Sequence, residues 1–211
     1  MQTEDKFLTL GILFALAVGG SVLLSRSHAA PAQKASPETA LPVGASRALL
    51  LGENYPELVN CPCVLIEFGD YQCPPCRLLY DSLQNFAPLK QGKVALVFRH
   101  YPLTEIHPDA LNAARAAEAA REQGAFWPMH DLLYAHYGKS DAKSIAQYAA
   151  QLNLNLPRLE TAMRTTAQQR ITRDTEAANQ LRISGTPTLI LCSPDAAPRL
   201  VRFEDLPRLL R

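Results

Sequence analysis

Two cysteines, Cys73 and Cys76, carry the strongest chemical signal in the sequence. They stand in the run Cys73-Pro74-Pro75-Cys76, shortly after an apolar stretch. A thiol at the start of a helix has a lowered pKa, because the helix dipole favours the thiolate, the form that reacts in thiol–disulfide exchange. Cys73 would therefore attack or be attacked by a substrate. Cys76, one turn further on, would resolve the mixed disulfide.

The cysteine pair has two other interpretations, half of a zinc site and a purely structural disulfide. Zinc would need two further ligands, which Cys61-Pro62-Cys63 could supply. Tetrahedral zinc sites use wider spacings than C-x-C, so this set would make a strained chelate. A structural disulfide would leave the reactive helix start unused. Redox exchange is the favoured interpretation, and no residue is assigned to a metal.

A strand, a helix and a second strand surround the pair. Residues 64–68 are a short apolar run, typical of a strand buried on both faces. Apolar residues then recur at helical spacing over 76–86, with proline in the first turn, where its missing N–H costs nothing. Residues 93–98 predict a second strand. This order implies two parallel strands with a right-handed crossover.

A helical block and two more strands complete the predicted domain. Residues 107–182 are rich in Ala, Gln, Leu and Arg and predict four or five helices. Gly124 and Gly138 are expected to end helices there, and Ser140 and Asn155 are expected to be N-caps. Residues 188–192 and 199–203 predict strands joined by a six-residue turn, before a short terminal helix. The pattern indicates an α/β domain with a helical insertion.

Composition limits the partners and cofactors. The chain has 211 residues, 47% of them hydrophobic, and 21 Lys and Arg against 20 Asp and Glu. The apolar fraction predicts a packed core, and the balanced charge disfavours binding to nucleic acid. No nucleotide or flavin motif is present, so no cofactor is expected.

The N-terminus predicts a membrane segment followed by a tether. Residues 7–24 are apolar and uncharged, which fits either a signal peptide or a signal-anchor over 1–24. Residues 25–46 are rich in Ala, Pro and Ser and predict a flexible linker. Small residues at Ser27-His28-Ala29 leave cleavage open. Arg26 and Lys34 follow the apolar segment, so the positive-inside rule tilts against export of the domain.

Several motifs in a fixed order carry a family resemblance. They are Glu67-Phe68-Gly69-Asp70-Tyr71-Gln72 before the cysteine pair, Phe98-Arg99-His100-Tyr101-Pro102-Leu103, Phe126-Trp127, His130-Asp131 and Gly185-Thr186-Pro187-Thr188. With Ala-rich helices between them, they resemble the DsbA-like thioredoxin-fold family from about residue 58 onward. The resemblance implies an α/β thioredoxin fold over 47–211 with a helical domain inserted at about 104–182.

The resemblance also implies the residues that bind substrate. Pro187 would follow a cis peptide bond and lie against the active-site disulfide. Thr186 before it would offer backbone groups to an extended substrate peptide, and Pro74 and Pro75 would lie beside that peptide. The substrates implied are protein thiols and disulfides, and a membrane redox partner would recycle the cysteines.

Two positions set the expected chemistry of the pair. Glu67 falls where the family places a buried acid, which would handle the proton as Cys76 becomes a thiolate. Its neighbours in the strand are apolar, which favours a buried carboxylate over an outward-facing one. The best-known oxidase of the family has Pro-His where this chain has Pro74-Pro75. Pro75 supplies neither a cation nor an N–H, so Cys73 is expected to be less acidic than in the strong oxidases.

Three further cysteines lie outside these motifs. The fold would place the start of strand 64–68 beside the end of strand 188–192. A structural disulfide from Cys192 to Cys63, or to Cys61, is therefore a hypothesis. Small buried thiols and a solvent-exposed C-x-C redox pair are the alternatives.

The sequence is thus interpreted as an extracytoplasmic thiol–disulfide oxidoreductase, an oxidase of exported proteins. It would be periplasmic and tethered to the inner membrane through residues 7–24, or secreted if the signal is cleaved. Net oxidation is favoured beyond the membrane, because cytosolic exchange usually runs toward reduction. The alternatives are a reductase or isomerase using the same pair, and a membrane-anchored chaperone that holds a thiol or a metal without turnover.

Overall fold

The computed structural model describes residues 41, 45–51, 55, 58, 61–194 and 196–210. All of them belong to one compact unit, residues 36–211. The predicted membrane segment, residues 7–24, and nearly all of the predicted linker, 25–46, lie outside the described residues. Within the described part, no helix combines the length and apolar character needed to span a membrane.

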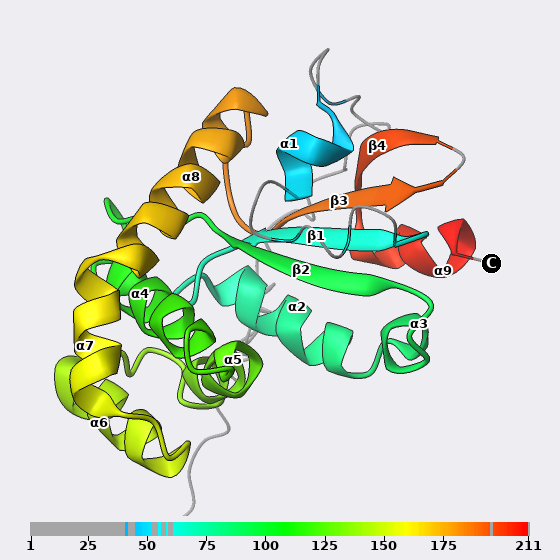
Figure 1. Cartoon of the computed structure of the whole chain (residues 1–211). Coiled ribbons are helices and arrows are strands. Elements are labelled where there is room, and N and C mark those ends of the chain that lie inside the picture. The colour runs from blue at the N-terminus through cyan, green and yellow to red at the C-terminus, as the bar shows by residue number, and fades with distance from the viewer. Residues whose placement is uncertain are drawn as a thin grey trace, which may run out of the picture. The chain divides into compact units, whose positions relative to one another are not determined.

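A mixed sheet of four strands forms the centre of the described domain (Figure 1). The strands are β1 Val64–Gly69, β2 Ala95–His100, β3 Thr188–Ser193 and β4 Ala196–Val201. Their order is β2-β1-β3-β4. β1 is parallel to β2, as predicted, and antiparallel to β3, and β4 is antiparallel to β3. The predicted α/β thioredoxin topology is confirmed.

Helices cover both faces of the sheet and form a separate group at one side (Figure 1). They are α1 Arg47–Leu51, α2 Pro74–Gln84, α3 Ala87–Lys90, α4 Ala110–Arg121, α5 Phe126–Ala135, α6 Ala142–Gln151, α7 Leu156–Arg164, α8 Thr166–Gln180, the 3-10 turn Phe203–Asp205 and α9 Leu206–Leu209. Leu50 of α1 packs with Ile66 and Phe68 on one face. Leu79 of α2 packs with Leu65 on the other. The predicted run of four or five helices is confirmed as α4 to α8.

Local signals explain several helix ends, and one predicted cap is corrected. Gly124 and Gly138 both have positive φ, +74° and +79°, as expected of residues that terminate helices. Asn155 caps α7 by accepting from the Arg158 N–H. The predicted cap Ser140 is wrong: Asp141 caps α6, accepting from two backbone N–H groups. Ser140 is buried instead, and its carbonyl accepts from the side chain of Asn112.

Two strand boundaries also differ from the prediction. β2 runs over 95–100 rather than 93–98, and β4 starts at Ala196, inside the segment predicted as a turn. Pro198 lies within β4, which is the last strand of the sheet. An edge strand tolerates proline because one side of its backbone needs no ladder hydrogen bond.

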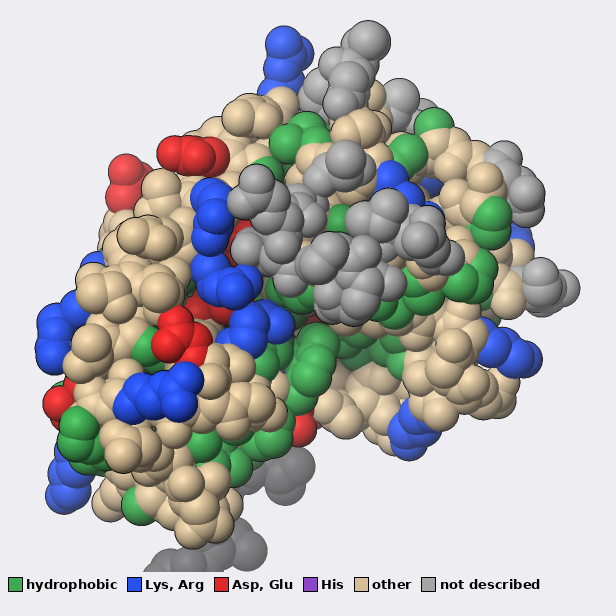
Figure 2. All heavy atoms as spheres, in the orientation of Figure 1, with side chains coloured by type: hydrophobic (Ala, Val, Ile, Leu, Met, Phe, Trp, Pro, Cys, Tyr) green, Lys and Arg blue, Asp and Glu red, His purple; other side chains and the backbone are tan. Residues whose placement is uncertain are grey.

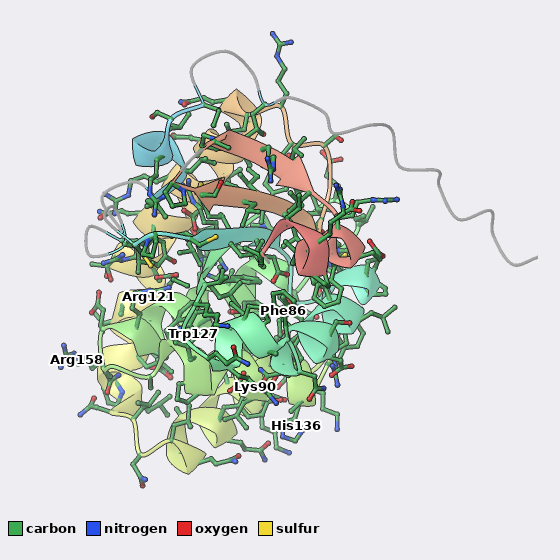
Figure 3. The ribbon with its side chains drawn as sticks, turned by 90° about the vertical axis from the view of Figure 1, so that its right-hand side faces the viewer. Phe86, Lys90, Arg121, Trp127, His136 and Arg158 are labelled. Carbon is green, nitrogen blue, oxygen red and sulfur yellow. The ribbon has the colours of Figure 1, made fainter. Side chains whose placement is uncertain are left out.

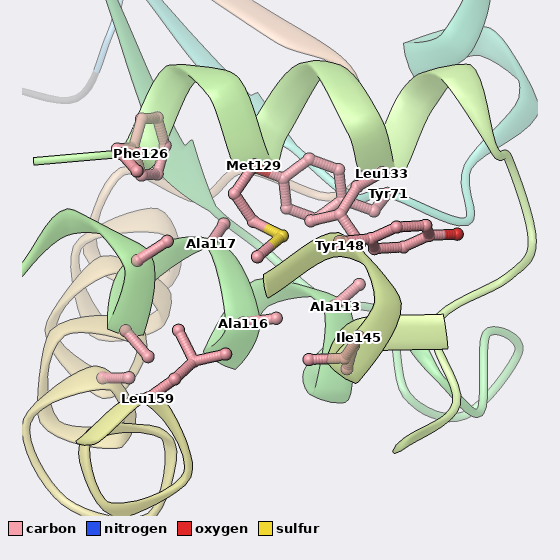
Figure 4. Packing of buried hydrophobic residues seen from close by; sticks show 14 of the residues in the cluster. Tyr71, Ala113, Ala116, Ala117, Phe126, Met129, Leu133, Ile145, Tyr148 and Leu159 are labelled. Atoms are coloured by element: carbon pink, nitrogen blue, oxygen red, sulfur yellow. The ribbon is translucent and has the colours of Figure 1, made fainter. Parts of the chain in front are cut away.

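The helical group is packed through small residues (Figure 4). The stripe of buried alanines on α4 lets α5, α6 and α7 approach closely, and larger side chains from those helices fill the space between them. The cluster labelled in Figure 4 is Tyr71, Ala113, Ala116, Ala117, Phe126, Met129, Leu133, Ile145, Tyr148 and Leu159. Tyr71 comes from the turn after β1, so this core reaches the end of the sheet that carries the cysteine pair.

Buried charges join the helical group to β2. The Arg99 Nε lies 2.7 Å from an Asp174 carboxylate oxygen, and the other Asp174 oxygen accepts from the His100 N–H at 2.9 Å. The His100 ring is 2.9 Å from Glu118, which also pairs with Arg121. Burial opposes ionisation of Glu118, but the hydrogen bonds and charges of His100 and Arg121 outweigh it and lower its pKa to about 2.

Removal of one buried partner should be costly. Asp174→Ala leaves the Arg99 guanidinium buried without its carboxylate, and we expect a loss of about 3–5 kcal/mol in the free energy of unfolding. The matched control is Asp81→Ala, which breaks a partly exposed pair with Arg77 within α2 and should cost less than about 1 kcal/mol. Urea denaturation of both variants tests this. Equal losses would contradict the importance of the buried pair.

Candidate active site

The cysteine pair lies where β1 passes into α2. Cys73 is the N-cap residue, and Pro74 and Pro75 occupy the first turn of the helix, exposed to solvent. The side chains of Cys73 and Cys76 are 4% and 0% exposed. A Cβ atom at Gly69, the last residue of β1, would collide with the Phe98 ring. Glycine is therefore required where the strand approaches the site.

The two thiols have opposite ionisation tendencies. The hydrogen bond from the Cys76 thiol is the main reason that the pKa of Cys73 falls from 9.0 to about 6. The Cys76 N–H lowers it further, against burial and the nearby Asp70. The pKa of Cys76 is raised by burial and by its hydrogen bond to Cys73. Cys73 is thus the thiolate at neutral pH, and Cys76 keeps its proton.

The turn before β3 completes one wall of the site. The Thr186–Pro187 peptide bond is cis, as the resemblance implies. The Cys73 sulfur lies 3.2 Å from the Thr186 carbonyl oxygen, to which the protonated thiol can donate. Pro187 and Pro75 line one groove of about 350 Å³, together with Leu78 of α2 and Phe203 after β4. The structure therefore brings together all four residues predicted to bind substrate, although their role stays a prediction.

Glu67 is buried beneath the pair. Its side chain is 2% exposed, which confirms the inward orientation predicted from its apolar neighbours. Burial, with a smaller contribution from Cys73, raises the pKa of this carboxyl to about 8. Its Oε1 atom has no hydrogen-bond partner among the residues that the structure describes. The carboxyl also raises the pKa of Cys76, so a charged Glu67 and a Cys76 thiolate disfavour one another.

A cavity of about 430 Å³ adjoins Glu67 on the side of α2 and α5. Trp127 and Lys90, both labelled in Figure 3, line it together with Tyr80 and Asp131. The Tyr80 hydroxyl donates to the Asp131 carboxylate at 3.0 Å. Polar side chains therefore lie between the buried carboxyl and the molecular surface.

His130 also lines this cavity. Burial lowers the pKa of its ring to about 3, so the imidazole is neutral. It hydrogen-bonds Tyr71 at 3.0 Å and contacts the rings of Phe98 and Trp127. His130 is thus a buried packing residue.

Asp70 was missed as a site residue by the sequence reasoning. Its carboxylate accepts from the Gln72 N–H at 2.7 Å and from the Leu103 N–H at 2.9 Å, and it lies 2.8 Å from the His107 ring. These contacts hold the turn before Cys73 against the loop that leads to α4. An aspartate directly after a strand, two residues before a bonded N–H, is a common turn signal and could have indicated it.

His107 and Tyr137 belong to the same support. The His107 ring contacts Asp70 from the loop before α4, which begins at Ala110. The Tyr137 hydroxyl donates to the Gln72 carbonyl at 2.5 Å. No sequence signal pointed to Tyr137, since this contact joins segments far apart in the chain.

The other three cysteines lie at the opposite end of β1. Val64 pairs with Cys192 across β1 and β3, and Cys63 directly precedes Val64. All five cysteines are free thiols in this structure. The predicted structural disulfide of Cys192 with Cys63 or Cys61 stays a prediction. Among the described residues, no three His, Cys, Asp or Glu side chains are placed to share a metal ion.

The chain has a thioredoxin fold with a helical group inserted after β2, and its paired thiols lie at the start of α2. A family model described as Thioredoxin matches residues 59–196. The chain belongs to this family.

Solved structures share the fold. The thiol-disulfide exchange protein alpha-DsbA2 of Wolbachia pipientis aligns with a TM-score of 0.63 and 20% identity, over 77% of this chain and 89% of that one. A thioredoxin-like oxidoreductase of Silicibacter pomeroyi DSS-3 aligns with a TM-score of 0.63 and 28% identity, over 78% of this chain and 95% of that one.

The curated relatives that match this chain are much longer than it is. The Na(+)/H(+) antiporter NhaA 3 of Salinispora tropica is 40% identical over 133 residues, which are 63% of this chain and 20% of the relative. The chain therefore spans about one fifth of the length of the curated relatives it matches.

Glu67 should make stability depend on pH. Its pKa is raised in the folded protein, from 4.5 to about 8. The unfolded state therefore loses this proton at a lower pH than the folded state, and the free energy of unfolding falls as pH rises between these two values. Glu67→Gln should therefore raise the free energy of unfolding by about 2–4 kcal/mol at pH 7.5 relative to its effect at pH 4. Urea denaturation of both reduced proteins measures it. A pH-independent difference would contradict a buried neutral carboxyl.

Two substitutions should move the Cys73 pKa in opposite directions. Cys76→Ala removes the strongest hydrogen bond to the thiolate and should raise the pKa toward the ordinary value of about 8.5. Pro75→His adds a cation beside the sulfur and should lower it below 6. Thiolate absorbance against pH gives both values, with Cys73→Ser as the blank. An unchanged titration in both variants would remove this account of the thiolate.

Proposed function

We propose that this protein is an extracytoplasmic thiol–disulfide oxidoreductase that passes disulfides from Cys73 and Cys76 to exported protein substrates. One observation carries the proposal: the Cys73 thiolate is stabilised by hydrogen bonds from its own resolving partner. A stabilised thiolate makes the reduced form favourable, and the corresponding disulfide is then a better oxidant. The oxidoreductase name of the 28% identical structure supports the activity.

Each turnover of an oxidase transfers two electrons from the substrate. A substrate thiolate attacks the Cys73 sulfur of the disulfide, since Cys76 is the more deeply buried of the two. The Cys73–Cys76 bond breaks, and Cys76 leaves with the electron pair and takes a proton. Glu67, neutral below a pKa of about 8, is the nearby group that can supply it.

The second half of the exchange reaction releases the oxidised substrate. A second thiolate of the same substrate attacks the substrate sulfur of the mixed disulfide and displaces Cys73. Cys73 leaves readily because its thiolate is the stable form. The substrate gains one disulfide, and the protein ends with a Cys73 thiolate and a Cys76 thiol. One of the two substrate protons is then on Cys76, directly or by way of Glu67, and the other is in solvent.

The surface around Cys73 suits an extended protein segment. Pro74 and Pro75 are exposed beside the thiol, and the Thr186 carbonyl adjoins it. The groove under Pro187 includes Leu78, which is 69% exposed. An apolar side chain of a substrate would bury this surface. On the face of the molecule shown in Figure 2, Lys and Arg side chains are interspersed with Asp and Glu, so this face has no broad patch of one charge.

A location at the outer side of the inner membrane fits two observations. Residues 7–24 are apolar and uncharged. The curated relatives carry the name of a Na(+)/H(+) antiporter, and about four fifths of their length lies outside the match. In this proposal the domain works beside the membrane, and a membrane redox partner reoxidises Cys73 and Cys76.

The equilibrium of the pair with glutathione tests the activity and its direction. We expect the full chain, in detergent, to show a two-electron transition at a potential above the glutathione poise of about −220 to −260 mV and below the DsbA value of about −120 mV. Cys73→Ser should lose both this transition and the oxidation of a dithiol peptide. A potential below about −270 mV, the thioredoxin value, would identify a reductase instead. Stoichiometric metal without exchange would favour the chaperone alternative.

A further inference from the structure

A cavity links the buried carboxyl of Glu67 to the surface of the domain. Its volume is about 430 Å³, and Glu67, which is 2% exposed, is its deeply buried lining residue. Gln84 of α2, Lys90 of α3 and Trp127 of α5 also line it, and all three are exposed. Lys90 and Trp127 are labelled in Figure 3. The cavity therefore reaches from the buried acid to solvent.

The walls of this cavity suit water. One water molecule needs about 10–15 Å³ of such space and two to four polar partners. Glu67, Tyr80, Gln84 and Asp131 supply polar atoms along the walls. The Glu67 Oε1 atom makes no hydrogen bond to any residue that the structure describes, so it is available to a water molecule in the cavity. A chain of water can carry a proton between a buried group and the surface.

Glu67 needs such a connection in the proposed reaction. It gives a proton to Cys76 when the disulfide opens, and it must regain one from solvent before the next turnover. Its neighbours in the sheet are Phe98 and Leu189, both apolar and buried, and neither can carry a proton. Cys76 is wholly buried as well. The polar cavity is therefore the connection that these neighbours do not provide.

Asp131 of α5 places a second carboxyl in the wall of the cavity, at a half-buried position that reaches solvent. Its carboxylate accepts from the Tyr80 hydroxyl at 3.0 Å and from the Gln84 side-chain amide at 3.4 Å. These two contacts hold the carboxylate in the cavity wall and join it to a hydroxyl that can both accept and donate a proton.

The surroundings of Asp131 suit proton exchange near neutral pH. Burial raises its pKa, against the hydrogen bond from Tyr80, and an acid is a better proton carrier when its pKa lies closer to the working pH. Two cations lie nearby: Lys90 lines the cavity, and the Arg77 guanidinium is 5.4 Å from the centre of the Tyr80 ring. Burial and Tyr80, rather than these cations, set the pKa of Asp131.

The other titratable groups near the cavity are poor carriers of charge at neutral pH. Burial lowers the pKa of His130 to about 3, so this ring does not take up a proton. Burial and the hydrogen bond to Asp131 raise the pKa of Tyr80 to about 12, so its hydroxyl passes a proton on without ionising. Burial also raises the pKa of Tyr134, with Glu67 adding to the effect. Asp131 is thus the residue in this wall that can pick up a proton from solvent and release it.

We propose that Asp131 and this cavity form the path by which Glu67 exchanges its proton with solvent, an inference that rests on the proposed function. When the disulfide opens, Glu67 protonates the Cys76 thiolate. Asp131 then takes a proton from solvent and passes it through the Tyr80 hydroxyl and water in the cavity to the Glu67 carboxylate. When the disulfide forms again, a proton leaves by the same path. One proton moves per exchange and no electron does. Asp131 acts through Glu67, so it is a positioning residue.

Oxidation of the reduced full chain by dithionitrobenzoate, in detergent at pH 7, separates the steps. The chain carries Cys61→Ser and Cys63→Ser, so that these partly exposed thiols do not react. Cys73 attacks the reagent first and releases one thionitrobenzoate, at a rate proportional to the reagent concentration. Cys76 then attacks the mixed disulfide and releases the second, at a rate independent of that concentration.

Only the second phase requires Cys76 to lose its proton. Glu67, with a pKa of about 8, is itself mostly protonated at pH 7. It must release its own proton through the path before it accepts the one from Cys76. The rate of the second phase therefore reports on the path, while the first phase reports on the Cys73 thiolate.

Two substitutions should interrupt the path. A positioned acid or base contributes roughly 10²–10⁴-fold, and water carries part of the proton flow, so Asp131→Asn should slow the second phase about tenfold. Tyr80→Phe keeps the aromatic ring, removes the hydroxyl and should slow it similarly. The first phase and the equilibrium with glutathione should stay unchanged in both variants, because a path alters rates and not end states. The matched control is Asp81→Asn, which removes an exposed carboxylate of α2 and should change neither phase.

A double substitution decides whether Asp131 acts through the carboxyl. With Glu67→Gln the path has no acid at its inner end, so adding Asp131→Asn should slow the second phase no further. Equal slowing with and without Glu67→Gln would overturn the proposal, and so would an unchanged second phase in Asp131→Asn and Tyr80→Phe. Failure of the proposed function would differ from both, since the unsubstituted chain would then lack the first phase or fail to oxidise a dithiol peptide.

Discussion

The hydrogen bond between the two thiols at the start of α2 is the interaction on which the chemistry depends. It makes one sulfur a thiolate near neutral pH and the other a poor acid, although both belong to the same residue type. The asymmetry arises from position, since Cys73 occupies the N-cap position of the helix and Cys76 is wholly buried one turn later. The cis peptide bond in the turn before β3 and the carboxyl of Glu67 on β1 both lie near this pair.

The rest of the domain keeps that geometry rigid. The turn before Cys73 is held by Asp70, whose carboxylate bonds two backbone N–H groups and contacts His107. The helical group is tied to β2 by Arg99 and Asp174, and Tyr71 joins its core to the same turn. Burial of these charges is tolerated because each meets an opposite charge or a backbone group. The insertion therefore supports the active-site turn in addition to covering it.

The two ends of β1 carry thiols in different surroundings. At one end a helix start, a buried carboxyl and a proline turn surround Cys73. At the other, Arg47 and Arg199 lie near Cys63, without a helix beginning at the sulfur. The length of β1 thus separates the two groups of thiols.

The sequence by itself determined the reactive pair, its place at a helix start, the parallel strands around it and the burial of Glu67. Those features rest on spacing within about ten residues and on apolar neighbours, which a chain carries locally. The role of Asp70 and His107, the cap at Asp141 and the start of β4 at Ala196 were decided by the tertiary structure. The face on which Cys63 lies was also set there, because a strand's register decides which side each residue takes. Contacts between distant segments depend on how the sheet and helices pack, and no local pattern records them.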